Sequence, residues 1–382
     1  MAVTRWVEGL TSAGVAAGIK PSGDLDVGLL VAERPLTWAG AFTRNAAAAA
    51  CVDWDRTALG RRAMALVVNS GNANACTGTA GRHTVESTAA AAAGQIGCGV
   101  DEVLVCSTGP IGIPLDPRLI ERALPAAASS LASGVEDFAR SILTTDTFPK
   151  VSTASSGGAS VTGVAKGAAM IAPNMATMLA FLGTDADVGV DALQAAVDWA
   201  VDRSFNRLCL DACESTNDSV VVLSTGTGPK LDDQELRAML LEVCSQLALK
   251  MARDAEGATK LVRIRIQGAS TEAHAAELGR AVARSDLWRA AAHGADPNWG
   301  RVLAAMGTVD RGLDVTRASV AIGDEVLFVK GEPGGLLAEA AAAMSGDEFT
   351  VSVALDQGDA AAEILTADLS EEYVTLNAEV TT

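Results

Sequence analysis

Short apolar runs of strand length alternate along the chain with longer segments in which apolar residues recur every three or four positions. The short runs predict buried β-strands, and the longer segments predict amphipathic helices that pack against them. The longest predicted helix spans about residues 232–255, where Asp232 and Glu235 have the spacing of a capping box. Strands and helices alternate over the whole chain, which predicts an α/β fold class.

The predicted strands lie at about residues 14–31, 39–44, 64–69, 102–106, 160–167, 177–182, 208–210, 220–223, 261–266, 318–322 and 349–354. Further predicted helices lie at about residues 83–94, 120–127 and 190–203.

The charge balance and the cysteines narrow the classes of function. The chain has 382 residues and a formal net charge of −18, so it lacks the basic surface that binding to nucleic acid or anionic lipid requires. No apolar run reaches the roughly 18 residues of a membrane span, and the first residues do not resemble a signal peptide. Seven cysteines without CxxC spacing and only three histidines predict no metal site and a reduced, cytoplasmic protein.

The segment 166–179, Lys-Gly-Ala-Ala-Met-Ile-Ala-Pro-Asn-Met-Ala-Thr-Met-Leu, has an unusual composition. Pro173 and Asn174 predict a turn just before the apolar run that begins at Thr177. A hydroxyl at this turn is placed to attack the preceding carbonyl, and cleavage of the Ala176–Thr177 bond would make Thr177 an N-terminal residue. Its free amine, with a pKa near ~7.7–8.0, could then accept the proton of its own hydroxyl. From these residues alone, an ordinary strand start at Thr177 is the simpler interpretation.

Catalysis by a threonine also requires an oxyanion hole and groups that hold the substrate. Thr108 and Gly109 follow a predicted strand and offer a hydroxyl and a backbone N–H, which are the donor types that stabilise an oxyanion. Lys166 and Glu256 offer opposite charges that suit the carboxylate and the amine of an amino acid. Taken singly, each of these residues also fits an ordinary loop or surface position.

Several motifs, in this order along the chain, resemble those of the ornithine acetyltransferase family, the bifunctional glutamate N-acetyltransferases of arginine biosynthesis. Two motifs are especially specific: Asn-Ser-Gly-Asn-Ala-Asn-Ala-Cys at 69–76 and Asp-Pro-Asn-Trp-Gly-Arg at 296–301. The matching segments span nearly the whole chain and are 14–23, 69–78, 107–109, 144–150, 166–179, 215–218, 254–260, 296–300 and 377–382.

The resemblance implies an aminopeptidase-like fold of mixed sheets covered by helices. The chain would cut itself into an alpha chain, residues 1–176, and a beta chain, residues 177–382, and the family implies an assembly of two alpha and two beta chains. Thr177 would take the acetyl group from N2-acetyl-L-ornithine and pass it to L-glutamate in a ping-pong exchange. No cofactor is implied, and acetyl-CoA would be a co-substrate only if the chain shares the second activity of bifunctional members.

The resemblance also implies roles for individual residues. Ala176 and Thr177 match the cleavage site, and Thr108 and Gly109 match the oxyanion hole. The positions that hold or orient the amino-acid substrate are matched by Thr144, Lys166, Thr177, Glu256, Asn377 and Thr382.

Four departures from the family pattern bear on the substrate. Ala169 replaces a glycine, residues 212–214 read Ala-Cys-Glu instead of Gly-Asp-Thr, residues 288–290 read Trp-Arg-Ala instead of Val-Lys-Thr, and Val380 replaces a tyrosine. These changes leave two alternatives open. One is a self-processed amidohydrolase or acyltransferase paralogue that acts on another acyl amino acid in secondary metabolism. The other is an uncleaved binding protein without catalytic activity.

Overall fold

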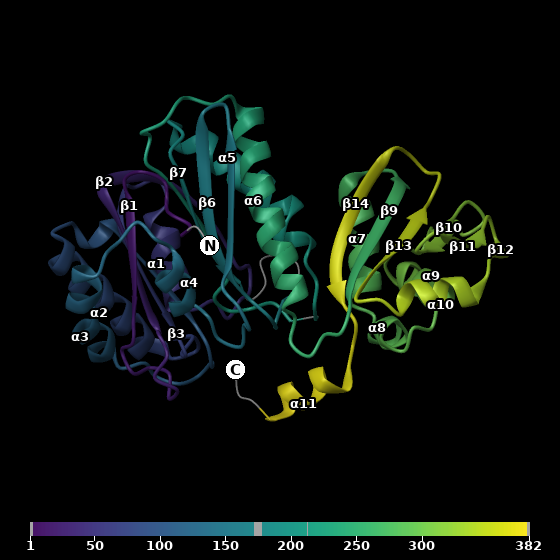
Figure 1. The fold of residues 1–382 in the computed structure, drawn as a ribbon, viewed down its shortest axis with the longest axis horizontal. Helices are drawn as coiled ribbons and strands as arrows, with labels where there is room; N and C mark the ends of the chain where they lie inside the picture. Colours follow the sequence, from purple (N-terminus) through teal and green to yellow (C-terminus); the bar gives the residue numbers. More distant parts are fainter. Residues whose placement is uncertain (1–2, 172–177, 212, 380–382) are drawn as a thin grey trace.

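The computed structural model describes residues 3–171, 178–211 and 213–379, which form two lobes (Figure 1). The first lobe contains β1 (Leu10–Val15), β2 (Val27–Phe42), α1 (Ala50–Ala58), β3 (Ala63–Ser70), α2 (Gly78–Ile96), β4 (Val103–Thr108), α3 (Pro117–Ser129), α4 (Glu136–Ser141), β5 (Lys150–Ser156), β6 (Ala159–Lys166), β7 (Leu179–Thr184), α5 (Val190–Arg203), β8 (Ser219–Ser224) and α6 (Asp233–Arg253).

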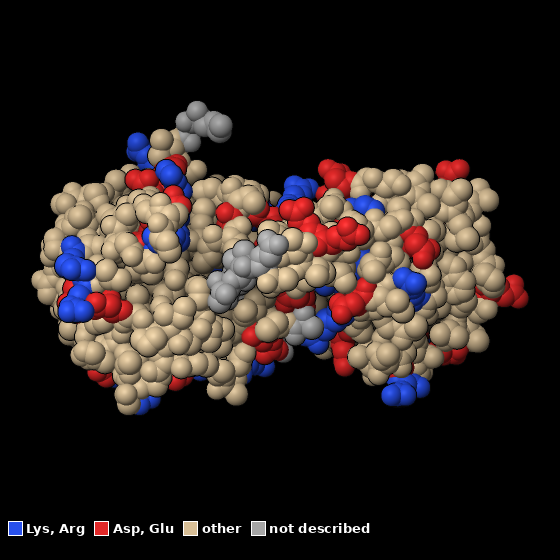
Figure 2. Space-filling model, turned by 90° about the horizontal axis from the view of Figure 1, so that it is seen from below, with Lys and Arg blue, Asp and Glu red and all other residues tan. Residues whose placement is uncertain are grey.

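The second lobe contains β9 (Leu261–Ala269), α7 (Glu272–Ala283), α8 (Asp286–His293), α9 (Trp299–Val309), β10 (Ser319–Ile322), β11 (Glu325–Val329), β12 (Glu332–Pro333), α10 (Leu337–Met344), β13 (Glu348–Ala354) and β14 (Ala360–Ala367). The helix α11 (Glu371–Glu379) follows, and Figure 1 shows it below the gap between the lobes. Viewed from that side, charged side chains of both signs gather around the junction of the lobes (Figure 2).

Each lobe is built on one sheet of mixed strand direction. In the described residues, the strand order is β4-β3-β2-β8-β7-β6-β5 in the first lobe, with β1 paired to β2, and β12-β11-β10-β13-β9-β14 in the second. The pairs β3–β4, β7–β8 and β9–β13 are parallel, and the other pairs are antiparallel. The predicted α/β fold with mixed sheets covered by helices is therefore confirmed.

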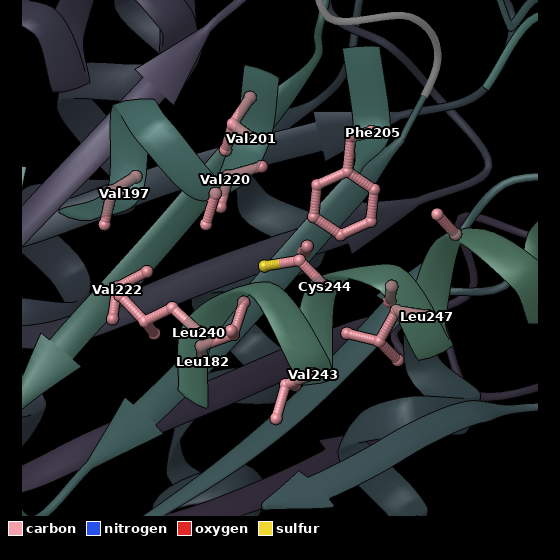
Figure 3. Packing of buried hydrophobic residues seen from close by; sticks show 14 of the residues in the cluster. Leu182, Val197, Val201, Phe205, Val220, Val222, Leu240, Val243, Cys244 and Leu247 are labelled. Carbon is pink, nitrogen blue, oxygen red and sulfur yellow. The ribbon is translucent and has the colours of Figure 1, made fainter. Parts of the chain in front are cut away.

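The long strand β2 divides the first sheet into two leaves. Its residues up to Leu36 pair with β3, and its residues from Thr37 pair with β8. Apolar side chains of both leaves, such as Leu104 of β4 and Phe181 of β7, share one buried cluster, so the leaves face each other. The helices α1 to α3 cover the outer face of one leaf, and α5 and α6 cover the other. Figure 3 shows this outer packing, with Val197 of α5 and Leu240 of α6 beside Val222 of β8.

The predicted helices agree well with the observed ones, whereas some predicted strands do not. The helix α6 begins as expected, because the Asp232 carboxylate accepts the N–H of Glu235 and the Glu235 carboxylate accepts the N–H of Asp232. The predicted strand at 208–210 is wrong, since Leu208 forms only an isolated bridge with Leu365. The predicted strands at 14–31 and 39–44 are instead β1 and the long β2.

None of the described helices is long and apolar enough to cross a membrane. All seven cysteines lie within the described residues, and none of them forms a disulfide.

Candidate active site

A cavity of about 520 Å³ lies where the end of β4 meets the end of β6. Every predicted site residue that the structure describes lines this cavity: Thr108, Gly109, Thr144, Lys166, Glu256 and Asn377. The predicted residues Ala176, Thr177 and Thr382 lie outside the described residues. Leu179, two positions after Thr177 in the sequence, pairs with Lys166 across β6 and β7.

The end of β4 supplies the predicted oxyanion hole. Thr108 is the last residue of β4 and is buried. Its Oγ1 accepts a hydrogen bond of 3.3 Å from the Lys166 ammonium, so the threonine proton remains available to donate to a ligand. Gly109 has φ +137°, and a Cβ at this position would lie only 2.4 Å from the backbone nitrogen of Asn72. The close packing of backbone against backbone therefore requires glycine here.

Four charged side chains form a buried network, in which Asp146 and Lys166 line the cavity and Lys150 and Asp254 lie behind them. The Lys150 ammonium lies 2.6 Å from the Asp146 carboxylate and 2.5 Å from the Asp254 carboxylate. Lys166 lies 4.0 Å from the second oxygen of Asp146. Asp146 also accepts the backbone N–H groups of Thr144 at 3.1 Å and of Gly167 at 2.7 Å. The network thus links the loop before β5 with both the end of β6 and the end of α6.

Burial and charge shift the pKa values of this network in definite directions. Burial lowers the pKa of Lys166 below its ordinary value, although Asp146 opposes the shift. For Asp146, burial alone would raise the pKa, but the ammonium groups of Lys166 and Lys150 outweigh it and lower the pKa. Asp146 is therefore a stable carboxylate that keeps two buried ammonium groups in place.

Another part of the cavity carries an incompletely paired carboxylate. Glu256 follows α6, and its Oε2 accepts a hydrogen bond of 3.1 Å from the Asn377 side chain on α11. Its Oε1 is buried and has no hydrogen-bond partner among the described residues. Leaving a buried carboxylate oxygen unpaired is unfavourable, so this group suits a ligand that brings a cation.

Asn217 and Asp218 lie in the matching segment 215–218, but the sequence analysis did not predict either of them as a site residue. The Asn217 side-chain amide donates to the carbonyls of Ala73 at 2.7 Å and Ser107 at 2.9 Å, and so fixes the residue before Thr108. Asp218 accepts the backbone N–H of Met178 at 2.9 Å, while its Oδ2 is buried without a partner in the described chain. Burial raises the pKa of Asp218 well above its ordinary value.

Most of the departures from the family pattern that the structure describes lie away from this cavity. Among those that the structure describes, only Ala169 lines it. Trp288 is fully buried in the core of the second lobe, where its ring centroid lies 6.5 Å from that of Phe349. Residues 212 and 380 lie outside the described residues. Groups of three or more His, Cys, Asp or Glu side chains that could hold a metal ion are absent from the described part of the chain.

Comparison with known proteins identifies relatives over nearly the whole chain. Residues 11–382 match the model of the ArgJ family. Arginine biosynthesis bifunctional protein ArgJ from Thermus thermophilus is 43% identical, and the alignment covers 99% of each chain. ArgJ from Streptomyces coelicolor is 42% identical, with 98% of each chain covered. The crystal structure of ArgJ from Bacillus halodurans is 33% identical with a TM-score of 0.50, and the alignment covers 52% of this chain and 98% of that chain.

Proposed function

Because this chain belongs to the ArgJ family, we propose that it transfers the acetyl group of N2-acetyl-L-ornithine to L-glutamate through an acetyl-Thr177 intermediate. The family membership expected from the motifs is confirmed, and with it an acyltransferase of arginine biosynthesis. The observation that carries the proposed site is the cavity at the ends of β4 and β6. It is lined by the Thr108 hydroxyl, by Gly109, by the Lys166 ammonium and by the Glu256 carboxylate, whose Oε1 has no partner among the described residues.

In the first half-reaction, the free amine of Thr177 takes the proton from the threonine hydroxyl, and the oxygen attacks the acetyl carbonyl. The carbonyl oxygen becomes negative, and the Thr108 hydroxyl and the Gly109 N–H donate hydrogen bonds to it. The C–N bond of the substrate then breaks, and ornithine leaves after its nitrogen receives the proton. The acetyl group stays on Thr177 as an ester.

In the second half-reaction, the amine of glutamate attacks the ester carbonyl. The threonine oxygen leaves as the hydroxyl, and N-acetylglutamate is released. No cofactor takes part in this exchange, and acetyl-CoA would enter only as an alternative acetyl donor.

The charged groups of the cavity suit an amino-acid substrate. Lys166 would hold the α-carboxylate, because its buried ammonium already lies beside Thr108 and so beside the reacting carbonyl. Glu256, whose Oε1 has no partner within the described part of the chain, would hold the side-chain ammonium of ornithine. Thr144, Asn377 and Thr382 would complete the contacts to the substrate.

We also infer that the mature protein consists of the chains 1–176 and 177–382, assembled as two copies of each in the cytoplasm. The aligned Bacillus halodurans chain is almost fully covered yet spans only 52% of this chain. Residues 177–382 make up a little over half of the sequence, so this length supports a division near Thr177.

The experiment that tests the function is intact mass analysis under denaturing conditions, before and after addition of N2-acetyl-L-ornithine. Two fragments that meet at Ala176 and Thr177 are expected, and the larger fragment should gain one acetyl group that added glutamate removes. The variant Thr177→Ala should remain a single chain. Acetate release without glutamate would instead favour the hydrolase, and a single uncut wild-type chain would favour the binding protein.

A further inference from the structure

The proposed exchange requires one cavity to accept two amino acids whose side chains carry opposite charges. The ammonium group of ornithine suits Glu256, whose Oε1 has no partner in the described chain. The side-chain carboxylate of glutamate would be repelled by the same group, because like charges at short range in a buried site are unfavourable. The acceptor therefore needs a cation elsewhere on the cavity wall.

The described charged residues that line the cavity are the cations Lys20, Arg140 and Lys166 and the anions Asp24, Asp146 and Glu256. Lys166 is engaged by Asp146 and by Thr108, and the proposed function assigns it to the α-carboxylate. The cations left for a second carboxylate are Lys20 and Arg140. Arg140 is exposed on the short helix α4, whereas Lys20 is partly buried.

The loop that carries Lys20 is held firmly in place. Asp26 is fully buried, and its carboxylate accepts the backbone N–H groups of Ala17 at 2.6 Å, Ile19 at 2.6 Å and Lys20 at 3.0 Å. Three backbone donors on one carboxylate fix the conformation of the loop before any ligand binds. The Lys20 backbone is thus pre-positioned, and only its side chain needs to adjust.

This loop also packs against the predicted oxyanion hole. A Cβ at Gly71 would lie 2.9 Å from Cγ of Lys20, and a Cβ at Gly109 would lie 2.6 Å from the carbonyl carbon of Gly71. Gly71 therefore lies between Lys20 and Gly109 and packs against both of them. Lys20 lines the same cavity as Thr108 and Gly109, one residue removed from the predicted oxyanion hole.

The ammonium group of Lys20 keeps donor capacity for a ligand. It donates one hydrogen bond of 2.8 Å to the carbonyl of Leu25, and an ammonium group has three donors. No carboxylate in the described chain lies within ion-pair distance of it. Of the acidic neighbours, Asp26 is occupied by the loop backbone, and Asp24 accepts a hydrogen bond of 2.8 Å from Ser22.

We propose that Lys20 binds the side-chain carboxylate of glutamate in the second half-reaction and thereby selects the acetyl acceptor. Glu256 then attracts the side-chain ammonium of the acetyl donor, ornithine, and Lys20 attracts the side-chain carboxylate of the acetyl acceptor, glutamate. This inference rests on the proposed function, and it concerns only the step after acetyl-Thr177 has formed.

The test measures the two half-reactions separately in the variant Lys20→Met. Ornithine release from N2-acetyl-L-ornithine and formation of the acetyl-enzyme, followed by mass, should remain as in the wild type. The glutamate concentration that gives half-maximal deacetylation should rise about tenfold to a hundredfold, which corresponds to one lost hydrogen bond between charged groups. The wild type should discriminate against glutamine as acceptor, and Lys20→Met should lose that discrimination.

Three variants serve as controls. Lys20→Arg keeps the positive charge, so the glutamate concentration that gives half-maximal deacetylation should stay close to that of the wild type. Lys230→Met removes an ammonium group that is 84% exposed and lies outside the cavity, and it should change neither half-reaction. Arg140→Met should have a smaller effect than Lys20→Met.

The results of these experiments distinguish a failure of the proposed function from a failure of the role proposed for Lys20. If the wild type forms no acetyl-enzyme, the proposed function fails. If the acetyl-enzyme forms but Lys20→Met leaves the glutamate dependence unchanged, or slows both half-reactions equally, the role of Lys20 is overturned. A larger effect of Arg140→Met would likewise overturn it.

Discussion

The Lys166 ammonium donates a 3.3 Å hydrogen bond to Oγ1 of Thr108 and so connects the predicted substrate clamp with the predicted oxyanion hole. Both side chains are buried, and they come from the ends of different leaves of the first sheet. Because the threonine oxygen accepts from lysine, its own proton is oriented away from the ammonium and toward other acceptors. This one contact would couple the proposed binding of the α-carboxylate by Lys166 to the proposed stabilisation of the oxyanion by Thr108.

Replacement of Thr108 by valine removes the hydroxyl donor while keeping a similar shape. We expect kcat to fall by about 10²–10³, because one oxyanion donor is lost at constant geometry. Steady-state kinetics with N2-acetyl-L-ornithine and glutamate measure the change. Thr108→Ser retains the hydroxyl and should keep most of the activity. Equal rates for the valine and serine variants would show that this hydroxyl does not act on the oxyanion.

The pH dependence of the reaction should reveal the titration of the Lys166 ammonium group. In the proposed function its protonated form binds the substrate α-carboxylate. Burial lowers the pKa of Lys166 from the ordinary value of 10.5, so kcat/KM should fall on the alkaline side before pH 10.5 is reached. In Lys166→Arg the guanidinium remains charged throughout this range, so the alkaline fall should disappear even if the overall rate is lower. An unchanged alkaline limb in Lys166→Arg would assign that limb to another group.

The sequence predicted the local elements of the fold better than their long-range arrangement. Residues 190–203 and the capping box at Asp232 were predicted correctly because periodicity and capping are local properties. The continuous strand β2 was missed because the sequence Glu33-Arg34-Pro35 has two charged residues followed by a proline, which interrupts the apolar pattern and is typical of a turn. In the structure these residues lie where β2 passes from one leaf to the other, between the residues that pair with β3 and those that pair with β8.

The candidate site could be predicted from motifs but not from periodicity. The roles of Thr108 and Lys166 came from the resemblance, and the structure places both on one cavity. The network behind them depends on a contact between Lys150 and Asp254, which are 104 residues apart, and no local pattern indicates such a pair. Asn217 lies in a matched motif, but its bond to the Ser107 carbonyl becomes apparent only in three dimensions.

The glycine at position 109 offers a test of the backbone of the oxyanion hole. In Gly109→Ala the new Cβ would collide with the backbone of Asn72, so the end of β4 must move and activity should be almost abolished. Gly112→Ala is a matched control, because Gly112 also has positive φ but a Cβ there meets nothing within 4 Å. Thermal unfolding and steady-state kinetics are measured for both variants. Gly112→Ala reports the effect of an alanine at positive φ alone, and Gly109→Ala reports that effect together with the collision. Similar losses of activity in both would argue against a special role for position 109.

The buried charge network should also determine the stability of the first lobe. In Lys150→Met, the carboxylates of Asp146 and Asp254 lose the ammonium group that lies within 2.6 Å of both, and we expect the free energy of unfolding to fall by about 3–5 kcal/mol. Chemical denaturation of the variant and of the exposed control Lys230→Met, which should change by less than about 0.5 kcal/mol, measures the effect.

The same variant has a predicted pH signature. In the wild type the pKa of Asp146 is lowered, so its contribution to stability is present above the ordinary value of 3.8 and is lost as the pH falls through the lower folded value. Without Lys150 that pKa must rise, and the loss of stability on acidification should begin at a higher pH than in the wild type. If Lys150→Met unfolds at the same pH and the same denaturant concentration as the wild type, the two carboxylates are not held by Lys150.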